Sequence, residues 1–268
     1  MKTLSRIVAV ALFLVSSQSG CSSDNATNSV SVAPKVVQSP SGFWSAKDVT
    51  IGTRIHGIDC MVAETQQLTC RTYIDGFDFF SAITGTLQVN GPRVSGSGSY
   101  FAAPGRSLPD GSTISELTIV SGTISEFNSL SLTIDVAGVR FTALFEYNSD
   151  LHDRGSALKT VEGVYPIFGF LEDSASFSVD ATGVISSQSG SGCVCNGQIS
   201  IIDDRYNIYD VALEVANCGA FDGVYAGLGL TTYIVVRDNA EVQNPTSNDV
   251  FLFNVFTEQL VIDGIASK

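Results

Sequence analysis

The chain has 268 residues, and its 27 acidic residues against 14 basic ones give a formal net charge of −13 at pH 7. A surface this acidic repels nucleic acid and anionic lipid, which excludes nucleic-acid binding and membrane attachment through charge. The length allows two domains of ordinary size.

The N-terminus has the pattern of a secretory signal peptide. Lys2 and Arg6 precede an uninterrupted apolar run of nine residues, 7–15, and small and polar residues follow as far as Cys21. This order of basic, apolar and small residues is typical of a cleaved signal. The run is too short to span a bilayer, which needs ~20 apolar residues. We therefore expect residues 1–20 to be removed on secretion.

The end of this signal, QSG followed by Cys21, resembles the lipobox of bacterial lipoproteins, although Gln18 stands where an aliphatic residue is usual. The resemblance implies that Cys21 becomes the first mature residue and carries acyl chains such as palmitate. Each buried CH₂ then contributes ~0.8 kcal/mol to anchoring. The residue after the cysteine is Ser22 and not Asp. In this the chain resembles lipoproteins that are sorted to the outer membrane, and the protein could face either the periplasm or the cell surface. The alternative is an ordinary signal peptide with an incidental cysteine.

Residues 21–40 are predicted to form a flexible tether. After the cysteine they are rich in Ser, Asn, Val and Pro, with no helical period and no aromatic residue. Fully extended, this stretch could reach ~60 Å. A strand at VSVAPKVV is the alternative, and Pro34 and Pro40 weaken it.

From Phe43 onward the pattern predicts β-strands. Apolar and polar residues alternate strictly over 129–135, 139–147 and 209–215, which is typical of strands with one buried face. Turn residues separate the strands at NGPR, PDGS, DATG and CNGQ. The glycine-rich stretches VSGSGSY and SQSGSGC are predicted as turns or bulges. Only residues 151–161 suit a helix or turn, and they also suit a domain boundary.

A faint internal repeat predicts two β units. SGFWSA is echoed by EGVYPI, and GSGSYFA by FDGVYAG, although chance likeness of glycine–aromatic pairs is the alternative. We expect an all-β protein with two tandem antiparallel domains, 41–155 and 156–268, of roughly seven or eight strands each. Each could be a small β-barrel or a β-sandwich, since both dispose of exposed sheet edges.

Secretion would expose the cysteines to oxidation. Five remain after Cys21, so one is left over. Cys60 and Cys70, separated by a polar loop, suit a hairpin disulfide that would stabilise the fold by ~2–3 kcal/mol. Cys193 and Cys195 would share one face of a strand, so one of the two should pair with Cys218.

The second half resembles a group of secreted or lipid-anchored β proteins of Gram-negative bacteria whose function is unknown. The resemblance covers most of 110–268 and is strongest over 162–230. The segments that carry it are GTISEFNSLSLTID, FTALFEYNSDL, VEGVY, FSVDATGVISSQSGSGCVCNGQISIIDDRYNIYDVALEVANCG and FDGVYAGLG. The group's pattern, G-C-V-aromatic-N-G with a later N-C or S-C, implies a Cys193–Cys218 disulfide. It leaves Cys195 as the odd, buried thiol, and it implies no catalytic residue.

Few residues suggest catalysis or metal binding. There is no G-x-S-x-G elbow and no supported S-x-x-K motif. His152 is interpreted as a loop residue, because neighbours such as Asp153 seldom face it, and His56 as structural or exposed. A metal site at Cys193 and Cys195 would need further soft ligands, and the two histidines are both remote in sequence from these cysteines, so no metal site is predicted there. A redox pair would need C-x-x-C.

Paired carboxylates could indicate glycoside hydrolysis. The candidate pairs are Asp75/Asp78, Glu172/Asp173 and Asp203/Asp204. Each lies in a polar turn, where Asp is favoured for local hydrogen bonding. DDRYN at 203–207 lacks the spacing of an EF-hand calcium loop.

We therefore predict an outer-membrane lipoprotein without enzymatic activity or cofactor, with a binding, assembly or structural role in the cell envelope. Its partners would be the membrane, through the lipid, and an envelope protein or polymer. One alternative is a carrier of a small apolar ligand, because Gly42 and Trp44 resemble the opening strand of lipocalins and the chain has sixteen phenylalanines. Another is an enzyme or enzyme inhibitor acting on envelope polymers.

Overall fold

The computed structural model describes residues 38–74, 78–168, 176–188, 192–232 and 250–267. The signal, Cys21 and the tether as far as residue 37 lie outside the described residues. Residues 36–268 form one compact unit. The predicted all-β class is confirmed, with strands in two antiparallel sheets. In the described part of the chain no helix is both long and apolar enough to cross a membrane.

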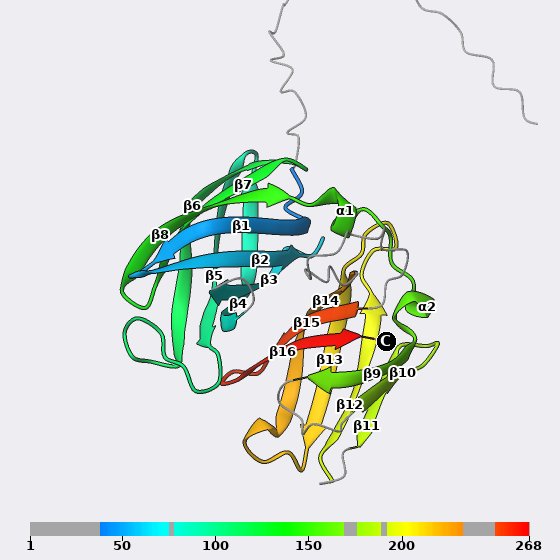
Figure 1. Ribbon diagram of the computed structural model, residues 1–268. Helices are drawn as coiled ribbons and strands as arrows, with labels where there is room; N and C mark the ends of the chain where they lie inside the picture. The colour runs from blue at the N-terminus through cyan, green and yellow to red at the C-terminus, as the bar shows by residue number, and fades with distance from the viewer. Residues whose placement is uncertain (1–37, 75–77, 169–175, 189–191, 233–249, 268) are drawn as a thin grey trace, which may run out of the picture. The chain divides into compact units, whose positions relative to one another are not determined.

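The first sheet is a closed barrel in which each strand pairs with the next (Figure 1, blue to green). Trp44 and Ser45 close it by pairing with Tyr147 and Glu146. The strands are β1 Gly42–Ile51, β2 Arg54–Val62, β3 Gln67–Ile74, β4 Asp78–Asn90, β5 Arg93–Ala102, β6 Ile114–Ser125, β7 Ser129–Val136 and β8 Val139–Tyr147.

The second sheet also has eight strands and curls until its last strand pairs with its first, at Ile265–Phe168 and Ala266–Ile167. Its strands are β9 Gly163–Phe168, β10 Ser176–Val179, β11 Val184–Gln188, β12 Val194–Ile201, β13 Tyr209–Ala216, β14 Gly223–Thr232, β15 Val250–Phe256 and β16 Val261–Ser267. The short helices are α1 Ser149–His152, α2 Leu158–Val161 and η1 Gly219–Phe221. The predicted strand number is confirmed, and α1 and α2 occupy the stretch that suited a helix.

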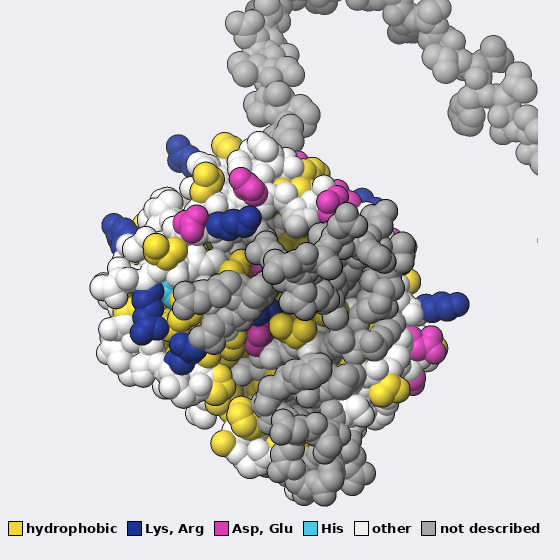
Figure 2. All heavy atoms as spheres, in the orientation of Figure 1, with side chains coloured by type: hydrophobic (Ala, Val, Ile, Leu, Met, Phe, Trp, Pro, Cys, Tyr) yellow, Lys and Arg dark blue, Asp and Glu magenta, His cyan; other side chains and the backbone are white. Residues whose placement is uncertain are grey.

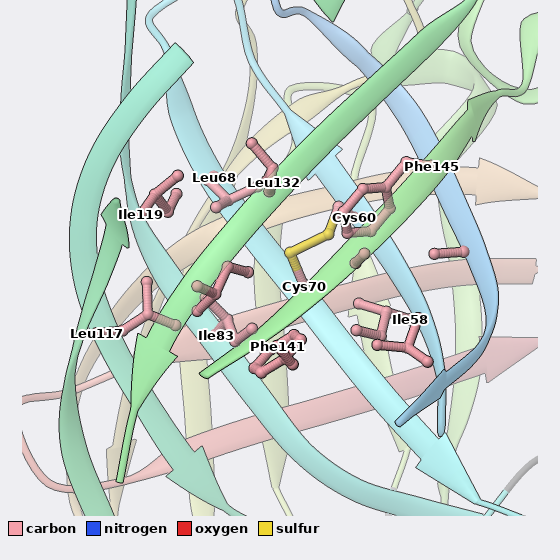
Figure 3. Close-up of a cluster of buried hydrophobic side chains, with 14 of the residues drawn as sticks. Ile58, Cys60, Leu68, Cys70, Ile83, Leu117, Ile119, Leu132, Phe141 and Phe145 are labelled. Carbon is pink, nitrogen blue, oxygen red and sulfur yellow. A yellow bond between two sulfur atoms is a disulfide. The ribbon is translucent and has the colours of Figure 1, made fainter. Parts of the chain in front are cut away.

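The apolar residues that alternate with polar ones in the sequence are the buried residues of the strands. On β7 the buried residues are Leu130, Leu132, Ile134 and Val136, and on β13 they are Tyr209, Val211, Leu213 and Val215. Side chains on the inner face of each sheet meet in a packed apolar core, and each fully buried large side chain contributes ~1.5–3 kcal/mol. Figure 3 shows this core in the first barrel.

The glycine-rich stretch VSGSGSY is a strand rather than a turn. It lies within β5, with a bulge between Val94 and Gly96 where β5 pairs with β6. Gly98 faces Gly85 on β4, and a Cβ on Gly98 would lie 2.0 Å from the Thr84 carbonyl oxygen. Glycine at this point therefore lets two backbones approach closely, as bent barrel strands require.

Both predicted disulfides are confirmed. Cys60–Cys70 joins directly paired residues of β2 and β3 and lies inside the barrel among Ile58, Ile83 and other apolar side chains (Figure 3). Cys193–Cys218 joins the residue before β12 to a residue just after β13.

The odd thiol is Cys195, as the resemblance implied, and it is buried. It lies on β12 and faces the apolar core of the second sheet. Burial raises the pKa of this thiol to about 11, so it is protonated and unreactive at neutral pH.

Two apolar clusters and an ion pair join the two sheets. One cluster contains Phe43 and Met61 with Ile208, Leu228 and Leu230, and the other contains Ala82 and Phe101 with Phe256 and Val261. Arg71 on β3 lies 3.7 Å from Asp263 on β16. Because these contacts place 36–268 in one unit, the division into separate domains 41–155 and 156–268 stays a prediction.

The last residues of the predicted tether are attached to the first barrel. The indole Nε1 of Trp44 donates to the Pro40 carbonyl at 2.9 Å, and the Ser39 amide donates to Glu126 at 3.1 Å. The folded body therefore includes residues 38–40.

Candidate functional site

One end of the first barrel carries a cavity of about 480 Å³, here called the mouth cavity. The β1–β2, β5–β6 and β7–β8 connections and the start of β4 lie at this end, because consecutive strands run antiparallel. Its floor consists of buried Ile51, His56, Phe80 and Leu108, and its rim includes Thr53, Arg54 and Arg106. The exposed rim residues leave the cavity open to solvent.

Two arginines share one aromatic ring in this cavity. The guanidinium carbons of Arg54 and Arg106 lie 5.2 Å and 5.4 Å from the centroid of Phe80. Phe80 is only 7 % exposed, so its ring is fixed by packing and holds both cations through cation–π attraction. The mouth cavity thus gathers positive charge in a chain whose net charge is strongly negative.

His56 on β2 forms part of the cavity floor, with its ring edge-on to Phe80 at 4.9 Å between centroids. It is buried, and its Nδ1 has no hydrogen-bond partner among the residues that the structure describes. Burial, and then the nearby charge of Arg54, lower the pKa of His56, so the ring is neutral at pH 7. A buried polar atom without a partner costs ~1–3 kcal/mol, which a ligand could recover.

A second cluster has the order of a nucleophile, base and acid. His152 Nε2 lies 3.2 Å from Ser41 Oγ, and His152 Nδ1 lies 3.2 Å from Asp153 Oδ1 and 2.6 Å from the Tyr147 hydroxyl. The interpretation of His152 as a loop residue is wrong. It ends the short helix α1, and at this helix end its side chain and that of Asp153 turn toward each other.

This cluster is closed to substrates. Ser41 is 2 % exposed and His152 is fully buried, with its ring stacked on Tyr206 at 4.4 Å. The Ser41 hydroxyl donates its only proton to Glu64, so His152 Nε2 does not accept that proton as a base toward Ser41 would. The cluster is therefore a buried hydrogen-bond network beside the junction of the two sheets, and it lacks the exposed nucleophile that catalysis needs.

Both histidines should make the protein less stable in mild acid. Burial lowers the pKa of His152 despite the opposing effect of Asp153, and the pKa of His56 is lowered as well. The unfolded chain, with an ordinary histidine pKa near 6.5, therefore binds more protons just below that pH. The free energy of unfolding should fall as the pH drops from ~7 through this window, by at most ~1.4 kcal/mol per pH unit for each histidine.

Urea unfolding between pH 7.5 and 5 measures this slope. His152→Gln should have a shallower slope than the natural protein, and subtracting the two curves removes the titration of groups common to both. Asp59 and Asp263 are two such groups. Burial raises their pKa, so their titration increases the free energy of unfolding as the pH falls, opposite to the effect of the histidines. Equal slopes for the two proteins would show that His152 titrates alike in the folded and unfolded chains.

The predicted carboxylate pairs do not form a shared site in the described residues. Asp203 forms an ion pair with Arg205 at 2.6 Å, and hydrogen bonds from Arg205 lower its pKa to about 2. Asp75, Glu172 and Asp173 lie outside the described residues, as does the side chain of Asp78. No group of three or more His, Cys, Asp or Glu that could hold a metal occurs in the part of the chain described.

The core of the second sheet contains a cavity of only about 10 Å³, lined by Phe177, Cys195, Phe253 and other apolar residues. Such a volume accommodates about one water molecule. Aromatic side chains fill this interior, with Tyr165 stacked on Phe177 at 5.1 Å between centroids. An apolar ligand would therefore need space that this core lacks.

Comparison of the chain with protein-family models, with curated proteins and with solved structures gave no match. The mouth cavity was not found from the sequence, because Arg54, Phe80 and Arg106 are far apart along the chain. The antiparallel pairing of successive strands brings their three segments to one end.

Proposed function

We propose that the protein is a lipid-anchored outer-membrane protein with a non-enzymatic binding role in the cell envelope. Acyl chains on Cys21 would hold it at the membrane, and the tether would separate the β-sheet body from the lipid. The two disulfides, Cys60–Cys70 and Cys193–Cys218, support a location where thiols are oxidised. The resemblance of the second half to Gram-negative envelope proteins supports the same location.

The mouth cavity is the observation that carries the binding role. It combines an apolar floor with positively charged side chains and is open to solvent, as ligand sites commonly are. The binding partner would be an envelope protein or polymer that presents a group small enough to enter. The enzyme alternative has less support, because the Ser41–His152–Asp153 cluster is buried and Asp203 is engaged by Arg205.

The carrier alternative also has less support. In lipocalin-like carriers the ligand occupies the barrel interior, whereas here apolar side chains pack both interiors. We retain the proposal that 41–155 and 156–268 are tandem domains, since each contains one complete eight-stranded sheet.

Site-specific photo-crosslinking in intact cells tests the binding role. A photoreactive residue at Thr53, on the rim, should capture an envelope component, whereas the same residue at exposed Gln88, toward the opposite end of the barrel, should not. Adding Arg54→Gln should reduce capture at Thr53. Capture that is absent, or equal from both positions, would reject binding at this end of the barrel.

A further inference from the structure

We infer that the mouth cavity binds an organic anion, in which a carboxylate, phosphate or sulfate group is attached to an apolar or aromatic body. This inference rests on the proposed binding role and specifies the chemistry of the ligand. A cavity of about 480 Å³ has room for one ring with its anionic substituent.

The charge at the mouth cavity is positive. None of the described residues that line the cavity is Asp or Glu, whereas Arg54 and Arg106 both line it. Figure 2 shows Lys and Arg side chains (dark blue) close to a histidine (cyan) on the left of the visible face. In a chain of net charge −13 most of the surface repels anions, so a local gathering of cations is where an anion can bind.

The two arginines of the cavity lie against one aromatic ring. Each guanidinium lies near the ring of Phe80, which is buried and cannot move far. A guanidinium is planar and presents paired N–H donors that match the oxygens of carboxylate, phosphate or sulfate. Holding it against a fixed ring reduces the entropy lost on binding.

The floor of the mouth cavity is mostly apolar. Ile51, Phe80 and Leu108 are buried apolar side chains that offer a surface to the ligand body rather than to its charge. His56 lies in the same floor, and its Nδ1 has no hydrogen-bond partner among the residues that the structure describes, so a polar atom of the ligand can supply that hydrogen bond. The floor therefore favours an anion with a ring or short chain over a bare inorganic ion.

Isothermal titration calorimetry on the full mature chain tests the inference. The probes are phenyl phosphate, benzoate and phenyl sulfate. Inorganic phosphate is the control that lacks the aromatic body, and benzylamine is the control that carries a positive charge in place of the negative one. We expect the aromatic anions to bind, inorganic phosphate to bind at least about ten-fold more weakly, and benzylamine not to bind. Higher salt should weaken anion binding.

Matched variants locate the site. Arg54→Gln should weaken binding of the aromatic anions at least about ten-fold, and Arg54→Lys should have a smaller effect because it keeps the charge but loses the paired donors. Arg93→Gln removes an exposed arginine near the opposite end of the same barrel and should leave affinity unchanged. Since Arg54 is exposed, these variants should fold, which circular dichroism checks.

Failure of every aromatic anion to bind, or equal binding by Arg54→Gln and the natural protein, would overturn the inference. Inorganic phosphate binding as tightly as phenyl phosphate would overturn the role of the apolar floor. If anions fail while crosslinking at Thr53 persists, the binding role stands and the anionic ligand is wrong. If both fail, the proposed function fails with it.

Discussion

Replacing Trp44 with alanine is expected to lower the free energy of unfolding by ~3–5 kcal/mol, as for other buried tryptophans. Trp44 is fully buried where β1 meets β8 and closes the first barrel. Its ring packs edge-on against Tyr147 at 5.2 Å, and its Nε1 donates to the Pro40 carbonyl. Alanine would leave a cavity at the closure and remove the bond that fixes the start of the body.

Trp44→Phe is the matched control, because it keeps an aromatic ring but loses the hydrogen bond and part of the volume. The free energy of unfolding of Trp44→Phe should fall by less than that of the alanine variant, ~1–2 kcal/mol. Unfolding in urea must be followed by circular dichroism, because Trp44 is the only tryptophan in the sequence. Equal stabilities for the alanine and phenylalanine variants would show that the ring does not support the closure.

Arg71→Met is expected to cost ~3 kcal/mol, because it leaves Asp263 as a buried carboxylate without its cation. The Asp263 side chain is 9 % exposed, and burial raises its pKa although Arg71 acts to lower it. Asn254 donates one hydrogen bond to Asp263 at 2.6 Å and cannot replace the charge. The pair joins β3 to β16, so its loss should weaken the contact between the two sheets.

The double variant Arg71→Met/Asp263→Leu removes both charges of the ion pair, so its stability shows how much of the loss in Arg71→Met comes from the unpaired Asp263 carboxylate. Removing both charges should restore much of the stability that Arg71→Met loses, since no uncompensated charge remains. The loss in Arg71→Met should also shrink in acid, where Asp263 takes up a proton. A double variant whose loss equals the sum of the two single losses would contradict this coupling.

The strands and disulfides were predictable because their signals are local. Period-two alternation, as in 129–135, fixes which face of a strand is buried, and Cys60 and Cys70 lie at a spacing that a hairpin brings together. The choice of Cys193 over Cys195 required the resemblance, because both lie near one strand face. A barrel could not be distinguished from a sandwich, since closure depends on how β1 meets β8 and not on either strand alone.

The candidate site was not predictable because its parts come from separate segments. Arg54 on β2 and Phe80 on β4 look like ordinary surface and core residues until the pairing of both strands with β3 brings them together. His152 was misinterpreted for a related reason. Adjacent side chains diverge along a strand, but at the end of α1 the backbone turns and His152 and Asp153 converge.

Intact mass spectrometry of the protein isolated from its own membranes is the most direct test of the central claim, that this is a secreted, lipid-anchored protein. We expect a chain that begins at Cys21, carries acyl chains, and is four hydrogens lighter than the reduced form because of two disulfides. A chain that retains Met1, lacks acyl chains and has every thiol reduced would contradict it.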